Sequence, residues 1–201
     1  MVWFWHSEHC LIWVTCAEHT KRSMDKMIYV ERLLALPEYR SLQKEIEILE
    51  ADRIYCRHAF SHSLDVCRIA WILFLEDQTQ SETEMGAQQF TLSEWKERIY
   101  LTGLLHDIGR VAQYQTGEHH GEAGRRVSER LLEEIGCPDS WRAEILFVVA
   151  LHFGRDGGRM RPKSLGDYIC RADHMSRNCF LCGASETCKW NEEEKNKTIT
   201  E

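Results

Sequence analysis

The chain has 201 residues, of which 43% are hydrophobic and 28% charged, with a formal net charge of -7. This length and apolar content predict one globular domain and exclude disordered, collagen-like and coiled-coil proteins. Because 25 Lys and Arg residues stand against 32 Asp and Glu residues, we expect neither long nucleic acid nor a membrane surface as a partner, and a phosphate-bearing ligand would need a local site.

Residues 1–26 form an N-terminal extension that holds three of the seven tryptophans. Histidine and glutamate interrupt its apolar residues, whereas a membrane span needs about 20 apolar residues and a secretory signal has a basic start. Ordinary helical sequence begins only at Met24 or Met27. One interpretation is a start codon upstream of the native one, and we assign no function to this segment.

Helical periodicity dominates the chain from residue 27 onward, and no short stretch alternates as a half-buried strand would. The sequence therefore predicts an all-α, single-domain bundle. Thr91 and Glu94 form a capping box before one helix, and Gly136 stops another. A polar stretch at 76–89 predicts the longest loop. The predicted helices, in chain order, lie near 42–49, 62–73, 91–109, 122–135, 141–152 and 164–176.

The bundle is predicted to span residues 27–190, including a cysteine cluster at 170–188. The charged tail at 191–201 has no apolar residue except Ile199, so we expect it to fray. The nine cysteines are an odd number in a chain too large to need disulfide staples. They therefore predict reduced thiols and a cytoplasmic location.

Three histidines lie on the apolar sides of different predicted helices: His62, His106 and His152. One such histidine is more often a satisfied core residue than a ligand. Three of them favour a metal site in the bundle core, where neutral imidazoles and carboxylates bind divalent ions. Asp107 and Asp173 supply the carboxylates.

The adjacent residues His106 and Asp107 constrain the local backbone. Neighbouring side chains on an α-helix diverge by about 100°. Both residues therefore reach one metal only at a helix end or a bend, and the nearby Gly109 makes such a bend possible.

Several motifs occur in a familiar order, and the most specific is Leu-Leu-His-Asp-Ile-Gly at 104–109. Others are the segment from His62 to Ala70, His-Gly-Glu-Ala-Gly at 120–124, and Ala172-Asp173. Over about residues 55–180 the chain resembles the HD-domain superfamily of metal-dependent phosphohydrolases. The resemblance implies that His62, His106, Asp107 and Asp173 bind one divalent metal, and that His120 and His152 add a second, with Asp107 bridging.

The resemblance also implies hydrolysis of a nucleotide or another small phosphate ester. One or two divalent ions, Mn, Fe, Co, Mg or Zn, would activate water and neutralise charge on the phosphoryl oxygens. His106, Asp107 and Arg110 are the expected catalytic residues. Arg110 and Arg155 are expected to bind the substrate phosphate. His58, one turn before His62, is expected to be a ligand, a partner of a ligand or a substrate contact; further candidate arginines lie at 159, 161 and 171.

The chain departs from the family pattern in two places. Arg110 stands where a lysine is frequent, which keeps the charge but offers a planar fork. A sister branch that acts on cyclic dinucleotides has a Gly-Tyr-Pro motif, and its absence here disfavours that substrate. Between the adjacent His119 and His120, the four-residue distance to Gly124 favours His120 as the ligand.

Cys179, Cys182 and Cys188 form a C-x2-C-x5-C pattern that suits zinc or an iron–sulfur cluster, with Cys170 or His174 as a fourth ligand. The pattern resembles the C-terminus of a poorly characterised branch of bacterial HD-domain proteins. Unliganded or redox-sensitive thiols are the alternative, and a permanent disulfide is less favoured. The other cysteines, Cys56 among them, are expected to be small buried hydrophobic residues.

Two further functions compete with the phosphohydrolase hypothesis. A di-iron HD-type oxygenase would use a similar scaffold with redox-active iron. A catalytically idle regulatory module would use the metal only to hold the bundle together. The sequence selects neither the base, sugar or chain length of a substrate nor an oligomeric state.

Overall fold

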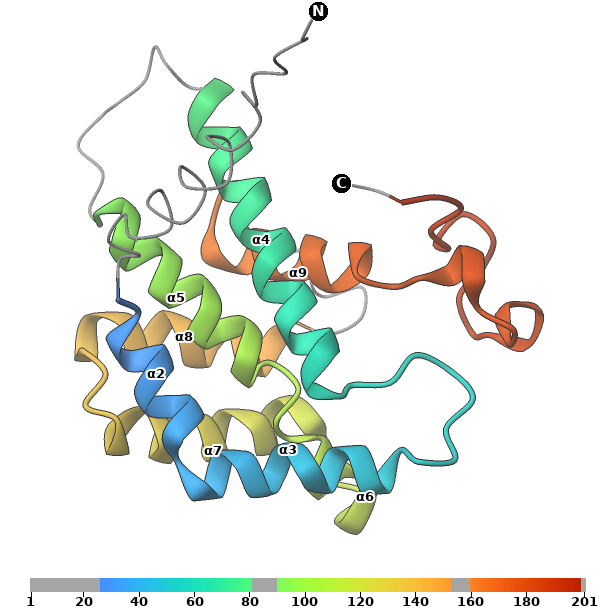
Figure 1. The fold of residues 1–201 in the computed structure, drawn as a ribbon, viewed down its shortest axis with the longest axis horizontal. Helices are drawn as coiled ribbons and strands as arrows, with labels where there is room; N and C mark the ends of the chain where they lie inside the picture. The colour runs from blue at the N-terminus through green and yellow to red at the C-terminus, as the bar shows by residue number, and fades with distance from the viewer. Residues whose placement is uncertain (1–25, 81–89, 153–159, 200–201) are drawn as a thin grey trace, which may run out of the picture.

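The computed structural model describes residues 26–80, 90–152 and 160–199, and within these ranges the chain forms helices and no strands (Figure 1). The predicted all-α fold is confirmed. The α-helices are α2 (Ile28–Ala35), α3 (Pro37–Leu49), α4 (Phe60–Gln80), α5 (Leu92–Leu105), α6 (Arg110–Thr116), α7 (His120–Glu134), α8 (Asp139–Leu151) and α9 (Leu165–Met175), followed by the short 3-10 helices Cys179–Leu181 and Ser185–Thr187.

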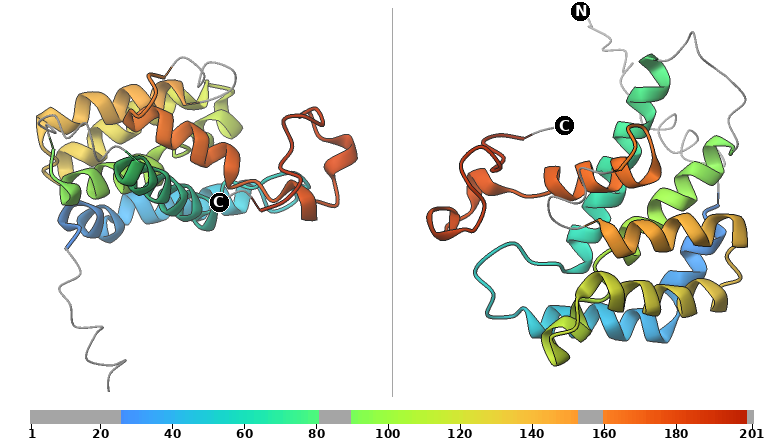
Figure 2. Two further views of the ribbon diagram at one scale, coloured as in Figure 1. Left: turned by 90° about the horizontal axis from the view of Figure 1, so that it is seen from above. Right: turned by 180° about the vertical axis from the view of Figure 1, so that it is seen from behind.

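One hydrophobic core joins these helices. Helix α4 packs against α5 and α9, and α7 packs against α8. The three views show the helices gathered on one side and residues 177–199 projecting from the end of α9 (Figures 1 and 2). No described helix has the length and apolar character to cross a bilayer. The fully buried side chains that join the helices include Val66, Leu105, Leu131, Ile145 and Ile169.

Side-chain caps set the starts of two helices, and the sequence predicted the first of these caps. The Thr91 hydroxyl accepts a hydrogen bond from the backbone N–H of Glu94, and the Glu94 carboxylate accepts one from the N–H of Thr91, which completes the capping box of α5. Ser164 caps α9 through the N–H of Asp167. The caps satisfy N–H groups that have no partner within the helix.

Gly109 allows the segment after α5 to pack on the start of α7. A Cβ atom at Gly109 would lie 2.0 Å from the carbonyl oxygen of His120 and 2.4 Å from the backbone nitrogen of Gly124. Both neighbours are backbone atoms, so no side-chain rotation would make room. This contact brings the His106-Asp107 pair close to His120.

Three helix boundaries differ from the sequence prediction in ways that matter for the site. Helix α4 continues to Gln80, so the polar stretch at 76–89 begins inside a helix, and its residues 81–89 lie outside the described ranges. Helix α5 ends at Leu105, and Gly109 instead precedes α6. Helix α7 begins at His120 and not near Glu122. For α4 and α7, polar residues extend or begin a helix whose other face is buried. For α5, the tight turns made by the N–H groups of Ile108 and Arg110 end the helix before Gly109. Apolar spacing alone reveals neither effect.

The charged tail is docked, whereas the sequence predicted fraying. Asn196 is 6% exposed, and its side-chain amide donates hydrogen bonds to the carbonyl oxygens of His174 and Arg177, each at 2.8 Å. These acceptors lie at and just beyond the end of α9, where carbonyl groups lack helical partners. The predicted N-terminal extension falls almost wholly outside the described residues.

Candidate metal centre

The six predicted metal ligands come together from separate parts of the bundle. His62 lies in the first turn of α4, His120 begins α7, and His152 caps the end of α8. Asp173 lies on α9, and the remaining two ligands lie between α5 and α6. Two groups of donor atoms lie within 4.8 Å of one another: His62, His106 and Asp107, and Asp107, His120 and His152.

A backbone bend after α5 turns both His106 and Asp107 toward the same point. The N–H of Ile108 donates to the carbonyl of Leu105 at 3.1 Å, and the N–H of Arg110 donates to the carbonyl of Asp107 at 2.9 Å. These tight i to i+3 turns replace the α-helical pattern. Adjacent side chains can then share one site, as the sequence requires.

The first half of the centre consists of His62, His106, Asp107 and Asp173. His62 Nε2 lies 3.2 Å from His106 Nε2, 3.6 Å from Asp107 Oδ2 and 3.3 Å from Asp173 Oδ1. His106 Nε2 lies 3.1 Å from Asp107 Oδ2. Two imidazole nitrogens and two carboxylates face one another, a donor set that suits a divalent cation.

The second half consists of His120 and His152 with the shared Asp107. His152 Nε2 lies 3.7 Å from Asp107 Oδ1, and the His120 and His152 rings lie 5.4 Å apart between centroids. His119 instead caps α7 by accepting a hydrogen bond from the N–H of Gly121. The structure therefore separates the adjacent pair, with His120 at the centre and His119 at the helix end.

Hydrogen bonds hold three of the imidazoles with Nε2 toward the centre. His106 Nδ1 donates to the carbonyl of Gly103 at 2.7 Å, and His152 Nδ1 donates to the carbonyl of Val149 at 3.0 Å. His62 Nδ1 lies 3.2 Å from the hydroxyl oxygen of Ser176. Because Nδ1 carries the proton, the Nε2 lone pair is left for a metal.

Electrostatics in the first half favour a positive charge. Burial alone would lower the pKa of His62, but hydrogen bonds and charge from Asp107 and Asp173 raise it to about 10. Burial would raise the pKa of Asp173, but His62 and His106 lower it. The two carboxylates thus stay ionised, and the negative potential that retains a proton on His62 would also attract a metal ion.

Arg110 gives the second half a different electrostatic character. Its Nε donates to Asp107 Oδ1 at 2.8 Å, the same oxygen that faces His152. Burial, followed by the charge of Arg110, lowers the pKa of His120 to about 3. His120 is therefore a neutral imidazole, which is the ligand form, but it lies beside a cation.

Glu50 is a buried partner of the centre that sequence analysis missed. This residue follows α3 and is 2% exposed. Its carboxylate accepts hydrogen bonds from Nδ1 of His58 at 2.5 Å and from the His58 N–H at 2.6 Å, and it also accepts one from the Tyr114 hydroxyl. Burial would raise the pKa of Glu50, but His58 and Tyr114 lower it to about 2.

The partnership with Glu50 orients His58 toward Asp107. His58 Nε2 lies 3.9 Å from Asp107 Oδ2. His58 lies before the first turn of α4, not inside that helix as its spacing to His62 suggested. Three separate segments therefore supply this series of contacts: Glu50 follows α3, His58 lies in the loop before α4, and Asp107 lies in the bend after α5.

A cavity of about 910 Å³ opens beside the centre, within the size range of small-molecule sites. Its lining includes His62, His120, His152 and Asp173. Of the predicted arginines, Arg110 and Arg171 line it, Arg161 does not, and Arg155 and Arg159 lie outside the described residues. Cationic residues that the sequence did not single out also line the cavity: Arg53, Arg177 and Lys189.

Cys170 and His174, the predicted fourth ligands, each contact a backbone carbonyl group. The Cys170 thiol donates to the carbonyl oxygen of His152 at 3.6 Å, beside the second half of the centre. His174 Nε2 lies 3.0 Å from the carbonyl oxygen of Glu194. Cys179, Cys182 and Cys188 lie beyond the end of α9, in residues 177–199.

Comparison with known proteins assigns the segment that contains the centre to a known family. The HD domain profile matches residues 59–178, which include all six ligands of the centre. An uncharacterized protein of Clostridium beijerinckii is 31% identical over 163 residues, covering 81% of this chain and 92% of the relative. No solved structure matches. The profile match and the ligand arrangement show that the chain belongs to the HD domain family.

Proposed function

We propose that the protein is a metal-dependent phosphohydrolase that acts on a nucleotide or another small phosphate ester. HD-domain proteins bind divalent metals and are generally metal-dependent hydrolases, and this chain has His and Asp groups that could hold such an ion. The observation that carries the proposal is the position of these groups beside a large cavity with a cationic lining.

The first half of the centre has the donor set to hold the metal through His62, His106, Asp107 and Asp173. A bound divalent ion supplies an activated water and neutralises charge on the phosphoryl oxygens. Asp107 remains ionised because Arg110, His106 and His58 outweigh the effect of burial and hold its pKa well below its usual range. His106 is fixed by Gly103, so the ligand geometry is set before a metal arrives.

Substrate phosphate is assigned to the cationic lining of the cavity. Arg110 lies closest to the ligands, since it donates to Asp107. Its guanidinium has further N–H groups that can bind phosphate oxygens in pairs. Arg53, Arg171, Arg177 and Lys189 add to the positive lining of the cavity. A local site of this kind fits a small phosphate ester and requires no broad basic surface.

His58 is the proposed proton donor to the leaving group. Glu50 holds its Nδ1, and its Nε2 lies on the side of Asp107. A histidine oriented by a buried carboxylate is a common general acid. In this proposal Glu50 is a positioning residue, because it acts through His58 and is not among the residues that line the cavity.

The proposed location is the cytoplasm. The seven cysteines of the described residues carry free thiols, as expected in a reducing compartment.

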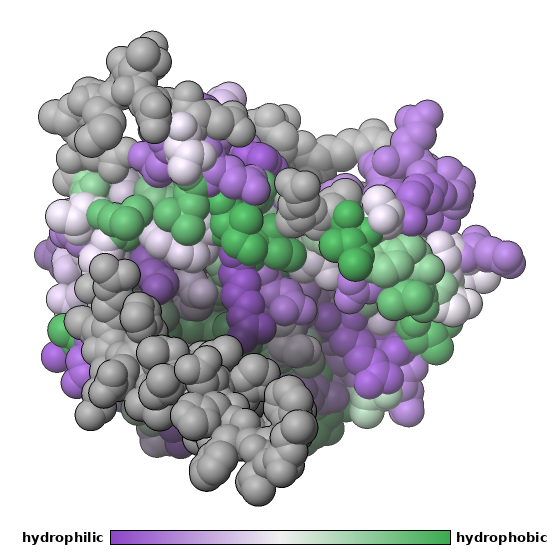
Figure 3. Space-filling view, turned by 45° about the horizontal axis from the view of Figure 1, so that its top comes forward, coloured by the Kyte–Doolittle hydropathy of each residue, from purple (hydrophilic) through white to green (hydrophobic). Residues whose placement is uncertain are grey.

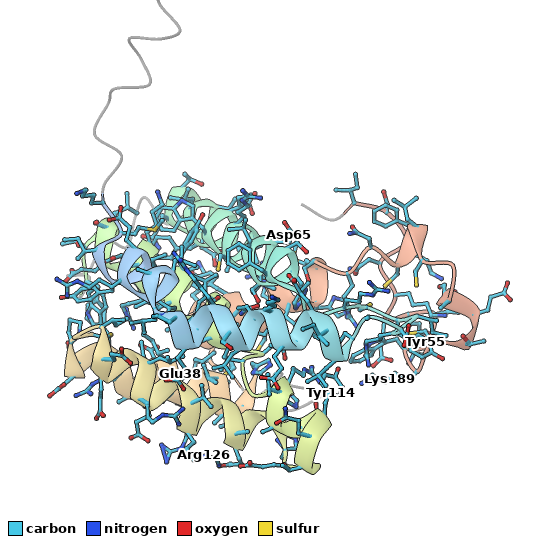
Figure 4. The ribbon with its side chains drawn as sticks, turned by 60° about the horizontal axis from the view of Figure 1, so that its bottom comes forward. Glu38, Tyr55, Asp65, Tyr114, Arg126 and Lys189 are labelled. Atoms are coloured by element: carbon cyan, nitrogen blue, oxygen red, sulfur yellow. The ribbon has the colours of Figure 1, made fainter. Side chains whose placement is uncertain are left out.

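A hydrolysis panel with Asp107→Asn tests the proposal. We expect anaerobically purified protein to release phosphate from nucleotides or sugar phosphates in Mn²⁺, Fe²⁺ or Co²⁺. Because Asp107 serves both halves, the variant should lose its metal and about 10³-fold in kcat/KM, equivalent to about 4 kcal/mol. Asp65→Asn is the control, since Asp65 is an exposed carboxylate on α4 (Figure 4).

Three outcomes would contradict the proposal. Equal activity of the two variants would exclude a role for the centre in the measured reaction. Oxygen consumption by the iron-loaded protein without phosphate release would indicate an oxygenase. Bound metal with no turnover on any phosphate ester would indicate a regulatory module.

A further inference from the structure

Cys56 lies beside the three C-terminal cysteines, although more than 120 residues separate it from each of them. The Tyr55 hydroxyl donates a hydrogen bond to the carbonyl oxygen of Thr187 at 3.2 Å. Tyr55 directly precedes Cys56 in the chain, and Thr187 directly precedes Cys188. Both cysteines line the same cavity. Figure 2 shows the loop before α4 and the C-terminal residues on the same side of the molecule, and Figure 4 shows Tyr55 close to Lys189.

The C-terminal cysteines follow one another through tight turns. The N–H of Cys182 donates to the carbonyl of Cys179, the N–H of Ser185 to that of Cys182, and the N–H of Cys188 to that of Ser185. Electrostatic interaction of the Cys56 thiol with Cys179, Cys182 and Cys188 raises its pKa further than burial alone. All four thiols are therefore neighbours, and all are free and partly exposed.

Residues 177–199, the C-terminal lobe, have no apolar core of their own. Only Arg177 and Asn196 are buried among them, and both are polar. Leu181 is 80% exposed and Ile199 is 79% exposed. Figure 3 shows hydrophilic and hydrophobic residues side by side on the surface at the right edge, where the lobe lies. A small lobe of turns that buries no apolar side chain needs another source of stability, such as a structural metal.

Two cations lie close to the thiols. Arg177 is 9% exposed, and its guanidinium stacks 4.3 Å from the ring centroid of Trp190. Its charge acts on Cys56. Lys195 donates to the carbonyl oxygen of Ser185 at 2.6 Å and interacts with Cys179 and Cys188. Positive charge at this position would offset the negative charge of cysteine ligands bound to a metal.

We propose that Cys56, Cys179, Cys182 and Cys188 form a structural zinc site that fastens the C-terminal lobe to the loop before α4. Binding releases the four thiol protons to solvent and forms four Zn–S bonds, with no change in oxidation state. The product carries two negative charges, which Arg177 and Lys195 offset. Four thiolates close the tetrahedral shell of a structural zinc ion, so no water ligand is needed.

Zinc would also draw the lobe inward. Among the described residues, the sets of three or more donor atoms that lie within 4.8 Å of one another belong to the HD centre. The four sulfur atoms are therefore farther apart than they would be around a bound zinc ion. Turns without a packed core can contract at low cost, and the free energy of metal binding then becomes folding free energy of the lobe.

The test counts zinc in the full chain while the HD centre is disabled. In a His106→Ala, Asp107→Ala background, purified protein should hold about one zinc ion per chain, as a closed four-cysteine site requires. Adding Cys56→Ser should remove it. Cys170→Ser is the matched control, because its thiol faces His152, and it should retain the zinc. Zinc that survives Cys56→Ser but is lost in Cys170→Ser would overturn the assignment.

A second measurement uses the chain without substitutions that threaten folding. Cobalt bound by thiolates absorbs in the near ultraviolet through sulfur-to-metal charge transfer, whereas histidine and carboxylate ligands give no such band. We expect this band in the cobalt-loaded protein, and faster proteolysis of the lobe after chelation. Absence of the band, or the broad visible absorption of an iron–sulfur cluster after anaerobic purification, would contradict a zinc site.

Discussion

The two halves of the metal centre share Asp107 but differ in charge. The first half adds a second carboxylate, Asp173, and its negative potential raises the pKa of His62 to about 10. The second half adds two imidazoles and no further carboxylate, and it lies beside Arg110, which donates to Asp107 Oδ1. Both halves consist of histidine and aspartate side chains, but the first half has a more negative electrostatic potential than the second.

This difference implies an order of binding. A metal held by the first half would take the place of the proton on His62 and face two carboxylates, whereas a metal held by the second half would face one shared carboxylate and a nearby cation. Arg110 would have to leave Asp107 Oδ1 before that oxygen could serve both halves. We expect substrate phosphate to favour this movement, because it offers Arg110 another anionic partner.

Separate substitutions in the two halves should have unequal effects. His62→Ala removes a ligand from the first half and should cost most of the bound metal and about 10²- to 10³-fold in kcat, the range expected for loss of metal activation. His120→Ala should retain one metal ion. Metal analysis after desalting, with kcat for each variant, makes the comparison. Equal metal loss in both variants would mean that the halves are equivalent.

Gly109→Ala tests the contact that joins the halves. The new Cβ would meet backbone atoms of His120 and Gly124 at 2.0 and 2.4 Å, so we expect a loss of about 1–3 kcal/mol in the free energy of unfolding. Gly183→Ala is the control, because nothing lies within 4 Å of its Cβ position. Urea denaturation of both variants measures the difference, and similar midpoints would show that the bend is loosely packed.

Arg110→Ala should make the two halves more alike. Removing the cation beside His120 should tighten binding of a second metal by about tenfold, or 1.4 kcal/mol, while weaker phosphate binding raises KM by a similar factor. Metal titration and steady-state kinetics measure the two effects. Arg110→Lys keeps the charge and should leave second-metal affinity nearly unchanged. Tighter second-metal binding in the lysine variant would show that guanidinium geometry, not charge, limits the second half.

Local motifs predicted which candidate ligands converge but did not predict the residues that hydrogen-bond to them. The string at 104–109 places His106, Asp107 and Gly109 within six residues, so their spacing is visible in the sequence. Glu50 reaches His58 from the end of another helix, and an isolated glutamate there has no distinctive pattern. Cys56 stands alone in the sequence and meets the other thiols only after the chain folds.

Helix existence was likewise easier to predict than helix ends. Apolar spacing identified the helices from α3 onward except α6, which is only seven residues long and too short to show a period. The docking of the charged tail depends on one amide, Asn196, and on carbonyl groups exposed at the end of α9. Composition described that segment correctly as charged but did not reveal this acceptor site.

Ser176 lies between the HD centre and the C-terminal lobe. Its hydroxyl donates to the carbonyl of Asp173 at 2.8 Å and contacts His62 Nδ1. The next residue in the chain, Arg177, is the first residue of the lobe. A displacement of the lobe would therefore turn the imidazole of His62, a candidate metal ligand. Thermodynamic linkage would make such an effect mutual: if zinc in the lobe strengthened metal binding at the HD centre by some factor, that metal would strengthen zinc binding by the same factor.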